Sequence, residues 1–191
     1  MKTIKNLVKT VIVLIVMVSF TTINAQKQYV KTKKSSLVWK GYKVTGSHTG
    51  TIDIKSASLT FNDNKLTEGE FTIDMTTLVS TDLTGEYKGK LEGHLKSDDF
   101  FGVNNHPTAN LKFTNVIATG KNAYKVTSDL TIKGKTNVVI FNLSVYGNKA
   151  TATLKVDRTK YGIRYGSASF FDNLKDKTIY DEFDLVVDLQ F

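Results

Sequence analysis

Cysteine is absent from this 191-residue chain, and its absence excludes several kinds of protein at once. The chain can form no disulfide, so its hydrophobic core must stabilise it alone. It can offer no thiolate to a metal and no catalytic cysteine. A lipid-modified N-terminal cysteine is excluded for the same reason.

Arginine is nearly absent as well. Of 26 basic residues, only Arg158 and Arg164 are arginines. Proteins that read nucleic acids gather arginine and aromatic side chains on one patch, and this sequence has no such patch. The formal net charge of +8 comes mainly from scattered lysines. This charge favours solubility and leaves open a transient contact with an anionic membrane surface.

Motifs for catalysis and metal binding are missing too. The three histidines, His48, His94 and His106, do not have the spacing of a zinc site. No nucleophile elbow, phosphate loop or dinucleotide fingerprint occurs. Asp98 and Asp99 are adjacent, and we interpret them as turn residues at the end of a helix. The sequence therefore predicts no catalytic residue, no metal and no cofactor, and a protein that is not an enzyme.

Residues 1–25 have the pattern of a signal peptide that is cleaved after Ala25. Three lysines precede an apolar run at residues 11–20 that is too short to span a bilayer. Residues 26–35 are polar and lysine-rich, and we expect a flexible lead-in there. Residues 36–191 are expected to form one domain. The export signal predicts a periplasmic or secreted protein.

Most of the remaining chain alternates between apolar and polar residues with the period of two that strands have. Residues 51–54, 57–61 and 70–75 are expected as separate strands, with turns at 62–65 and at 147–148. The pattern predicts about eight antiparallel strands on hairpin connections. Such strands close into a barrel or stack as a sandwich, and the barrel is favoured because closure removes both sheet edges.

One segment departs from this period. Tyr87, Leu91 and Leu95 recur at every fourth residue, which predicts a helix. The helical pattern ends in the adjacent aromatic residues Phe100 and Phe101. We interpret this segment as a lid or plug on a cavity, with the two phenylalanines either in the cavity wall or in ordinary core.

The two arginines bracket a short loop that follows a strand. Two interpretations of Arg158 and Arg164 stay open. One is a structural ion pair with an acidic neighbour such as Asp157 or Asp181. The other is a cationic site for a charged head group.

Six sequence blocks, taken in order, carry a resemblance to a known family. The blocks are His48-Thr49-Gly50, residues 69–75, residues 94–101, Pro107-Thr108-Ala109, residues 130–136 and residues 158–163. Together they resemble the YceI-like family of exported, lipocalin-like, polyisoprenoid-binding proteins. The resemblance implies an all-β fold, an antiparallel lipocalin-like β-barrel of about eight strands with one inserted α-helix. It also implies a long apolar channel for an isoprenoid chain.

The resemblance and the strand alternation together indicate which residues line this channel. The expected lining residues are Trp39, Phe71, Ile73, Met75, Leu95, Phe100, Phe101, Phe113, Leu130, Ile132, Phe141 and Leu143. The candidates for polar contacts with a head group are Arg158, Arg164, His48 and His94. The expected partner is an isoprenoid or other long-chain lipid, and a homodimer stays open.

Two other functions stay open beside lipid binding. A secreted stress-related or structural barrel with a packed interior and no stable ligand would need no cavity. An enzyme acting on a hydrophobic substrate would need a titratable group inside the barrel, such as an inward-pointing His48 or His94. The presence and lining of a cavity therefore discriminate among the three.

Overall fold

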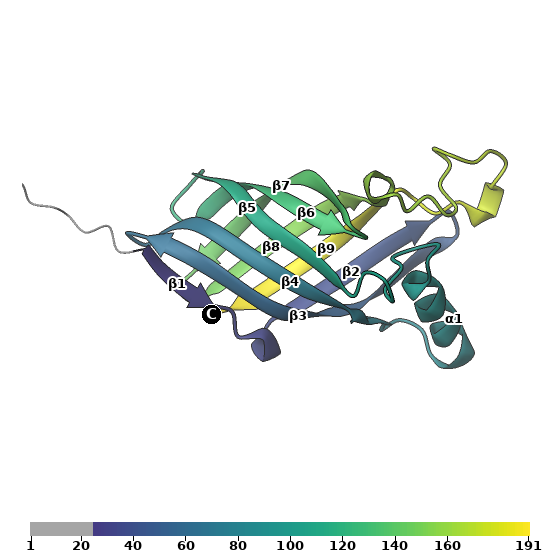
Figure 1. Cartoon of the computed structure of the whole chain (residues 1–191), viewed down its shortest axis with the longest axis horizontal. Helices are drawn as coiled ribbons and strands as arrows, with labels where there is room; N and C mark the ends of the chain where they lie inside the picture. The colour runs from purple at the N-terminus through teal and green to yellow at the C-terminus, as the bar shows by residue number, and fades with distance from the viewer. Residues whose placement is uncertain (1–24) are drawn as a thin grey trace, which may run out of the picture.

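The computed structural model describes residues 25–191, which form an antiparallel barrel with one α-helix (Figure 1). Apart from Ala25, the predicted signal peptide lies outside the described residues. The strands are β1 Ala25–Tyr29, β2 Ser36–Lys43, β3 Gly46–Asn62, β4 Lys65–Ser80, β5 Thr108–Ala118, β6 Ala123–Ile132, β7 Lys135–Tyr146, β8 Lys149–Asp157 and β9 Glu182–Gln190. The helices are α1 Gly85–Lys96 and the short 3-10 helices η1 Thr32–Lys34, η2 Arg158–Tyr161 and η3 Lys175–Lys177.

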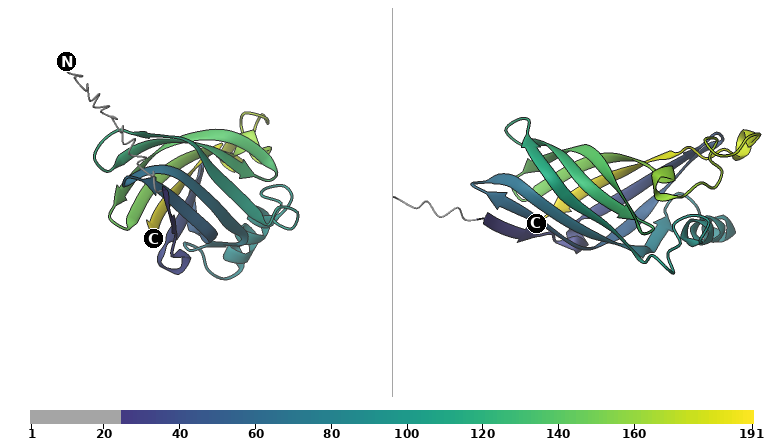
Figure 2. Two further views of the ribbon diagram at one scale, coloured as in Figure 1. Left: turned by 60° about the vertical axis from the view of Figure 1, so that its left-hand side comes forward. Right: turned by 45° about the horizontal axis from the view of Figure 1, so that its top comes forward.

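The eight strands β2 to β9 close because β3 pairs with both β2 and β4. Closure lets every strand turn its apolar face inward without leaving an open barrel edge. The left-hand view of Figure 2 shows the strands wrapping around a common interior. The predicted antiparallel barrel of about eight strands with one inserted helix is confirmed, and the sandwich alternative is excluded.

Strand β3 differs from the sequence-based expectation. Residues 51–54 and 57–61 belong to one strand of 17 residues, not to two. Its register against β4 shifts between Thr51 and Asp53 and again between Ile54 and Ser56. Such irregularities interrupt the side-chain alternation and bend the strand while pairing continues. The break in the pattern therefore marks a bend of one strand around the barrel.

Two hairpin turns lie where the sequence predicts them. Asp63 and Asn64 join β3 to β4 with φ values of 48° and 61°. Gly147, with φ of 60°, begins the turn between β7 and β8. Left-handed φ values in two-residue loops match the twist of the flanking strands.

Residues 26–35 carry regular structure, which corrects the expectation of a flexible lead-in. Strand β1 pairs with β3 from Ala25 opposite Asn62 to Tyr29 opposite Ser58. Strand β2 pairs with β3 only along the first part of β3. Along the last part of β3, the same edge pairs with β1. The polar side chains of β1 gave no sign of this pairing, because backbone groups provide it.

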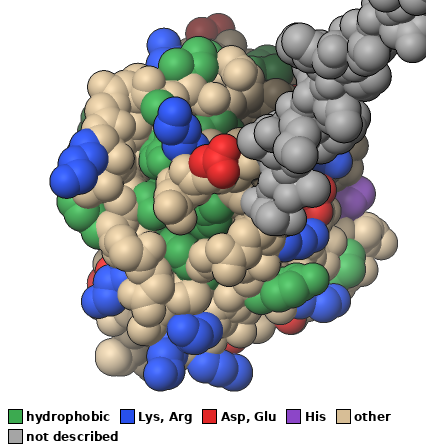
Figure 3. Space-filling model, turned by 90° about the vertical axis from the view of Figure 1, so that its left-hand side faces the viewer, with side chains coloured by type: hydrophobic (Ala, Val, Ile, Leu, Met, Phe, Trp, Pro, Cys, Tyr) green, Lys and Arg blue, Asp and Glu red, His purple; other side chains and the backbone are tan. Residues whose placement is uncertain are grey.

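One end of the barrel is filled by aromatic side chains. The rings of Phe61 and Phe191 lie 5.6 Å apart, and buried Tyr124 receives a hydrogen bond at its hydroxyl oxygen from the Leu66 backbone N–H at 3.3 Å. Figure 3 shows this end of the molecule, where basic side chains lie around hydrophobic ones. The other end carries α1 and the β8–β9 connection (Figure 1).

The predicted helix is present, and contacts with β4 hold it against the barrel. The Ser80 backbone N–H donates to Glu92 Oε1 at 2.8 Å, and Lys88 Nζ lies 2.8 Å from the same oxygen. Leu95 is buried, whereas Tyr87 is 75% exposed, so the helix meets the barrel with its C-terminal part. No helix among residues 25–191 is long and apolar enough to cross a membrane.

Candidate ligand cavity

A cavity of about 270 Å³ lies at the barrel end that carries α1. Its wall is mainly apolar and comes from β2, β3, β4, α1, the α1–β5 connection, the β8–β9 connection and β9. We call it the mouth cavity. Four of the expected lining residues form part of this wall: Trp39, Leu95, Phe100 and Phe101.

Phe100 and Phe101 are both core residues and cavity wall. They are 6% and 9% exposed, and their ring centroids lie 5.2 Å apart in an edge-to-face arrangement. The chain turns back at the end of α1, where the Phe101 N–H donates to the Leu95 carbonyl at 3.1 Å. This turn directs both rings inward. Both interpretations from the sequence, cavity wall and ordinary core, therefore apply to these two residues.

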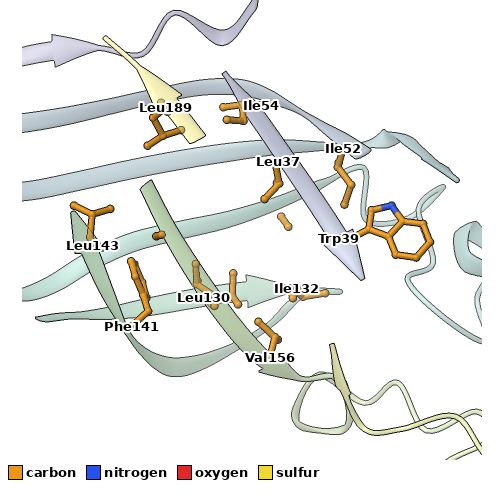
Figure 4. Packing of buried hydrophobic residues seen from close by; sticks show 14 of the residues in the cluster. Leu37, Trp39, Ile52, Ile54, Leu130, Ile132, Phe141, Leu143, Val156 and Leu189 are labelled. Carbon is orange, nitrogen blue, oxygen red and sulfur yellow. The ribbon is translucent and has the colours of Figure 1, made fainter. Parts of the chain in front are cut away.

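Trp39 is fixed by its indole and by a glycine. Its Nε1–H donates to the Val79 carbonyl at 3.1 Å, and the ring lies against Gly50. A Cβ at Gly50 would come within 1.8 Å of the same carbonyl oxygen, so only glycine fits. Figure 4 shows Trp39 on β2 beside Ile52, at one end of the row of labelled core residues.

A second, smaller cavity of about 70 Å³ lies deeper in the barrel. We call it the inner cavity. Among the expected lining residues, its wall contains Phe71, Ile73, Phe113, Leu130, Phe141 and Leu143. All of these side chains are apolar, and Asn110 is the one polar residue in the wall of the inner cavity.

Met75, Ile132 and Val156 lie in the barrel interior near both cavities, and we infer that their side chains form the layer that separates the two; we call these three residues the partition. All three are buried and line neither cavity. Along β4, Met75 lies between inner-cavity and mouth-cavity residues, and Val156 has the same place on β8. The structure thus has two cavities where the resemblance implies one long channel.

Arg158 lines the mouth cavity, but its donors are occupied. The side chain is 2% exposed and donates to the carbonyls of Ile163, Ile179 and Tyr180 at 2.9 to 3.0 Å. Burial lowers the pKa of its guanidinium, and the carboxylate of Asp181, 3.6 Å away, acts in the opposite direction. The structural pairing left open from sequence is therefore present, and Arg158 fastens the β8–β9 connection.

Arg164 does not reach either cavity. Its side chain is exposed, and its guanidinium carbon lies 4.4 Å from the ring centroid of Phe170. Although Arg158 and Arg164 are close in the sequence, the structure places them in different environments. One lies in the core and the other lies on the surface.

His48 and Asp82 form a hydrogen-bonded pair at the mouth cavity. His48 Nδ1 lies 2.9 Å from Asp82 Oδ2. Burial raises the pKa of Asp82, but hydrogen bonds from His48, the Ser80 hydroxyl and the Thr49 N–H outweigh it and lower the pKa to about 2. This arrangement ties the start of β3 to the β4–α1 connection.

His94 faces the mouth cavity with an unpaired polar atom. Its ring packs edge-on against Phe100 and Tyr165, with centroids 5.5 and 4.4 Å away. Its Nε2 is buried and has no hydrogen-bond partner in the described part of the chain. A buried polar atom without a partner is costly, so a ligand group could satisfy it.

Sequence reasoning missed several wall residues. Phe183 belongs to the alternating C-terminal strand and could have been found from that pattern. Tyr165 and Tyr180 come from the irregular β8–β9 connection, where no periodicity marks a direction. Only the folded chain brings them to the cavity.

Two further observations limit the chemistry. An open groove of about 570 Å³ on the barrel wall has mainly polar and charged residues, including Lys27, Glu70 and Lys112, and does not suit an apolar chain. Within residues 25–191, no group of three or more histidine, aspartate or glutamate side chains could hold a metal ion.

Comparisons with known proteins agree with this architecture. A family model described as the YceI-like domain matches residues 28–191. No curated protein matches the chain. Among solved structures, BcnA of Burkholderia cenocepacia superposes with a TM-score of 0.66 at 21% identity, covering 84% of this chain and 98% of BcnA.

Two more distant structures share the fold. A polyisoprenoid-binding domain from Saccharophagus degradans, implicated in plant cell wall breakdown, has a TM-score of 0.57 at 15% identity, covering 87% of this chain and 97% of that domain. The YCEI protein of Campylobacter jejuni has a TM-score of 0.53 at 14% identity, covering 66% of this chain and 72% of the other. At these identities the likeness concerns the fold.

Proposed function

Because this chain belongs to the YceI-like family, we propose that its barrel binds and shields a long apolar lipid, an isoprenoid chain or a similar one. The observation that carries the proposal is the mouth cavity, with about 270 Å³ and a mainly apolar wall. The name of the Saccharophagus degradans relative, a polyisoprenoid-binding domain, supports the same ligand class. The signal-peptide pattern of residues 1–25 supports a periplasmic or secreted location for this activity.

The size of the mouth cavity indicates how much ligand it holds. A cavity of about 150 Å³ accommodates benzene, or roughly 25 Å³ per carbon, so the mouth cavity holds about ten carbons or two isoprene units. Burial is worth roughly 0.8 kcal/mol per CH₂-sized group, or about 8 kcal/mol before association costs. A longer chain would reach the inner cavity only if the partition moved.

His94 gives the ligand a polar contact. An alcohol or carbonyl on the lipid would hydrogen-bond with Nε2, the buried atom that lacks a partner. A catalytic base would need an orienting partner, and no hydrogen bond joins the His94 ring to a carboxylate within residues 25–191. For His94 the geometry therefore favours binding over catalysis; His48, which does have a carboxylate partner in Asp82, uses it to join β3 to the β4–α1 connection.

A packed barrel without a stable ligand is the second candidate. The inner cavity of about 70 Å³ and the intact partition favour it, because the deep interior is largely filled. Native mass spectrometry after gentle purification distinguishes the two candidates. Recovery of a bound lipid supports the carrier, whereas ligand-free protein with no affinity for prenyl lipids would overturn it.

The role of His94 is tested with two ligands of one length, farnesol and its hydrocarbon analogue farnesene. We expect His94→Phe to weaken farnesol binding by about tenfold, the value of one hydrogen bond, and to leave farnesene binding nearly unchanged. Calorimetry or fluorescence displacement measures both affinities. Equal losses for the two ligands would show that His94 only shapes the cavity.

A further inference from the structure

Exposed apolar side chains gather in the β8–β9 connection, which forms part of the mouth-cavity wall, and in the adjoining β2–β3 turn. Tyr165, Phe170, Phe171 and Tyr180, all in the β8–β9 connection, are between 44% and 52% exposed, and Val44 in the β2–β3 turn is 54% exposed. We call these five residues the aromatic rim. The β8–β9 connection projects beyond the barrel beside α1 (Figure 1 and the right-hand view of Figure 2).

Hydrogen bonds join the two parts of the rim into one surface. The Val44 N–H donates to the Thr178 carbonyl at 3.1 Å, and the Tyr180 N–H donates to the Tyr42 carbonyl at 2.9 Å. Inside the connection, the N–H groups of Phe170 and Phe171 both donate to the Ser167 carbonyl. The connection is therefore an ordered segment that presents its aromatic rings outward.

The rim continues into the cavity. Tyr165 and Tyr180 line the mouth cavity and are also about half exposed to solvent. An apolar chain entering past these rings would meet little water between the surface and the cavity. Exposed apolar patches of this kind mark sites where a protein contacts another apolar surface.

The charges around the rim indicate which surface it contacts. Residues 165–171 contain no charged side chain. The segments 42–47 and 164–180 together hold four cations, Lys43, Arg164, Lys175 and Lys177, and two carboxylates, Asp172 and Asp176. The next two carboxylates, Asp181 and Glu182, lie 3.6 and 3.7 Å from Arg158 and Lys155, which balance their charge. Aromatic residues flanked by excess basic residues suit the interface of a bilayer that contains anionic lipids.

We propose that the barrel docks through its aromatic rim on the surface of an anionic phospholipid bilayer, with the mouth cavity facing the lipid. The proposal rests on the proposed function in one respect, since docking would let an apolar ligand pass between bilayer and cavity without crossing water. The occupant of the rim is thus a lipid surface, and a partner protein or a second copy of the chain is the competing outcome.

Vesicle flotation with the full mature chain tests this docking. The probe is a vesicle of phosphatidylglycerol and phosphatidylcholine, compared with phosphatidylcholine alone. We expect the wild-type chain to bind the anionic vesicles, and F170S/F171S to bind them on the order of tenfold more weakly. The matched control I117S/Y146S, which removes two exposed apolar side chains of β5 and β7, should bind like wild type.

The results separate docking from ligand binding. Farnesol affinity, measured without vesicles, should be the same for F170S/F171S and wild type, which also shows that the variant is folded. If the wild-type chain does not bind farnesol, the proposed function is overturned but docking is not. Absence of vesicle binding, equal vesicle binding by both double variants, or self-association through the rim overturns docking.

Discussion

At the scale of single residues, Tyr161 has a hydroxyl group without a partner. The side chain is 1% exposed, and its oxygen has no hydrogen-bond partner among residues 25–191. Burial, and to a lesser degree the charge of Asp157, raises the pKa of Tyr161 to about 12. Leaving a buried hydroxyl unpaired costs about 1–3 kcal/mol, so this residue reduces the stability of the fold.

We predict that Tyr161→Phe raises the free energy of unfolding by about 1 kcal/mol at neutral pH. The difference should grow as pH rises from 10.0, the ordinary pKa of tyrosine, to about 12, because the unfolded tyrosine ionises in this window while the folded one stays neutral. Urea unfolding of both proteins across this range measures it.

The control for Tyr161 is Tyr146→Phe, since Tyr146 is 64% exposed. This variant should follow wild type at every pH, because its hydroxyl is already hydrated. The difference between variants is the quantity to compare, because contributions from all other groups are common to the three proteins. If Tyr161→Phe were less stable than wild type, the Tyr161 hydroxyl would have a hydrogen-bond partner in solution.

At the scale of elements, the Glu92 carboxylate is one of the contacts that hold α1 to the barrel. Glu92 accepts a hydrogen bond from the Ser80 backbone N–H and pairs with Lys88. The hydrogen bond and charge of Lys88 help to lower the pKa of Glu92. The side chain is only 18% exposed, so loss of this carboxylate leaves a backbone donor without its partner.

We predict that Glu92→Ala loosens α1 by about 1–2 kcal/mol, so that its backbone amides exchange faster with solvent and a bound lipid leaves faster. Hydrogen exchange followed by mass spectrometry measures the first effect. Glu86→Ala is the matched control, because Glu86 pairs with Lys90 on the exposed side of the same helix and should change little. Equal effects of the two substitutions would contradict the anchoring role of Glu92.

At the scale of the whole molecule, the partition decides how long a chain the barrel encloses. Met75 is its most flexible member, since an unbranched side chain has more rotamers than valine or isoleucine. Removing it would join the mouth and inner cavities. A joined cavity would accept a longer chain.

We predict that Met75→Ala raises the affinity for geranylgeraniol relative to geraniol by about tenfold, because further isoprene units become buried. Leu66→Ala is the control, a buried residue at the closed end that lines neither cavity. Both variants should lose about 2–5 kcal/mol of unfolding free energy. An unchanged ratio of the two affinities in Met75→Ala would show that the partition does not limit chain length.

Much of the fold and part of the site could be predicted because the signals are local. Alternation places Phe71, Ile73 and Leu130 on inward faces, since side chains of a strand alternate whatever the strand pairs with. The four-residue spacing of Leu91 and Leu95 predicts α1, since residues at this spacing lie on one face of a helix. These patterns do not show where two inward side chains meet.

The amino-acid sequence by itself determined the all-β class, the helix, the tight turns and the resemblance to the YceI-like family, because each depends on neighbouring residues. Only the tertiary structure decided that β1 pairs with β3, that Arg158 is buried while Arg164 is exposed, and that Met75 and Ile132 line neither cavity. These outcomes depend on segments far apart in the chain, which meet only after the barrel has closed.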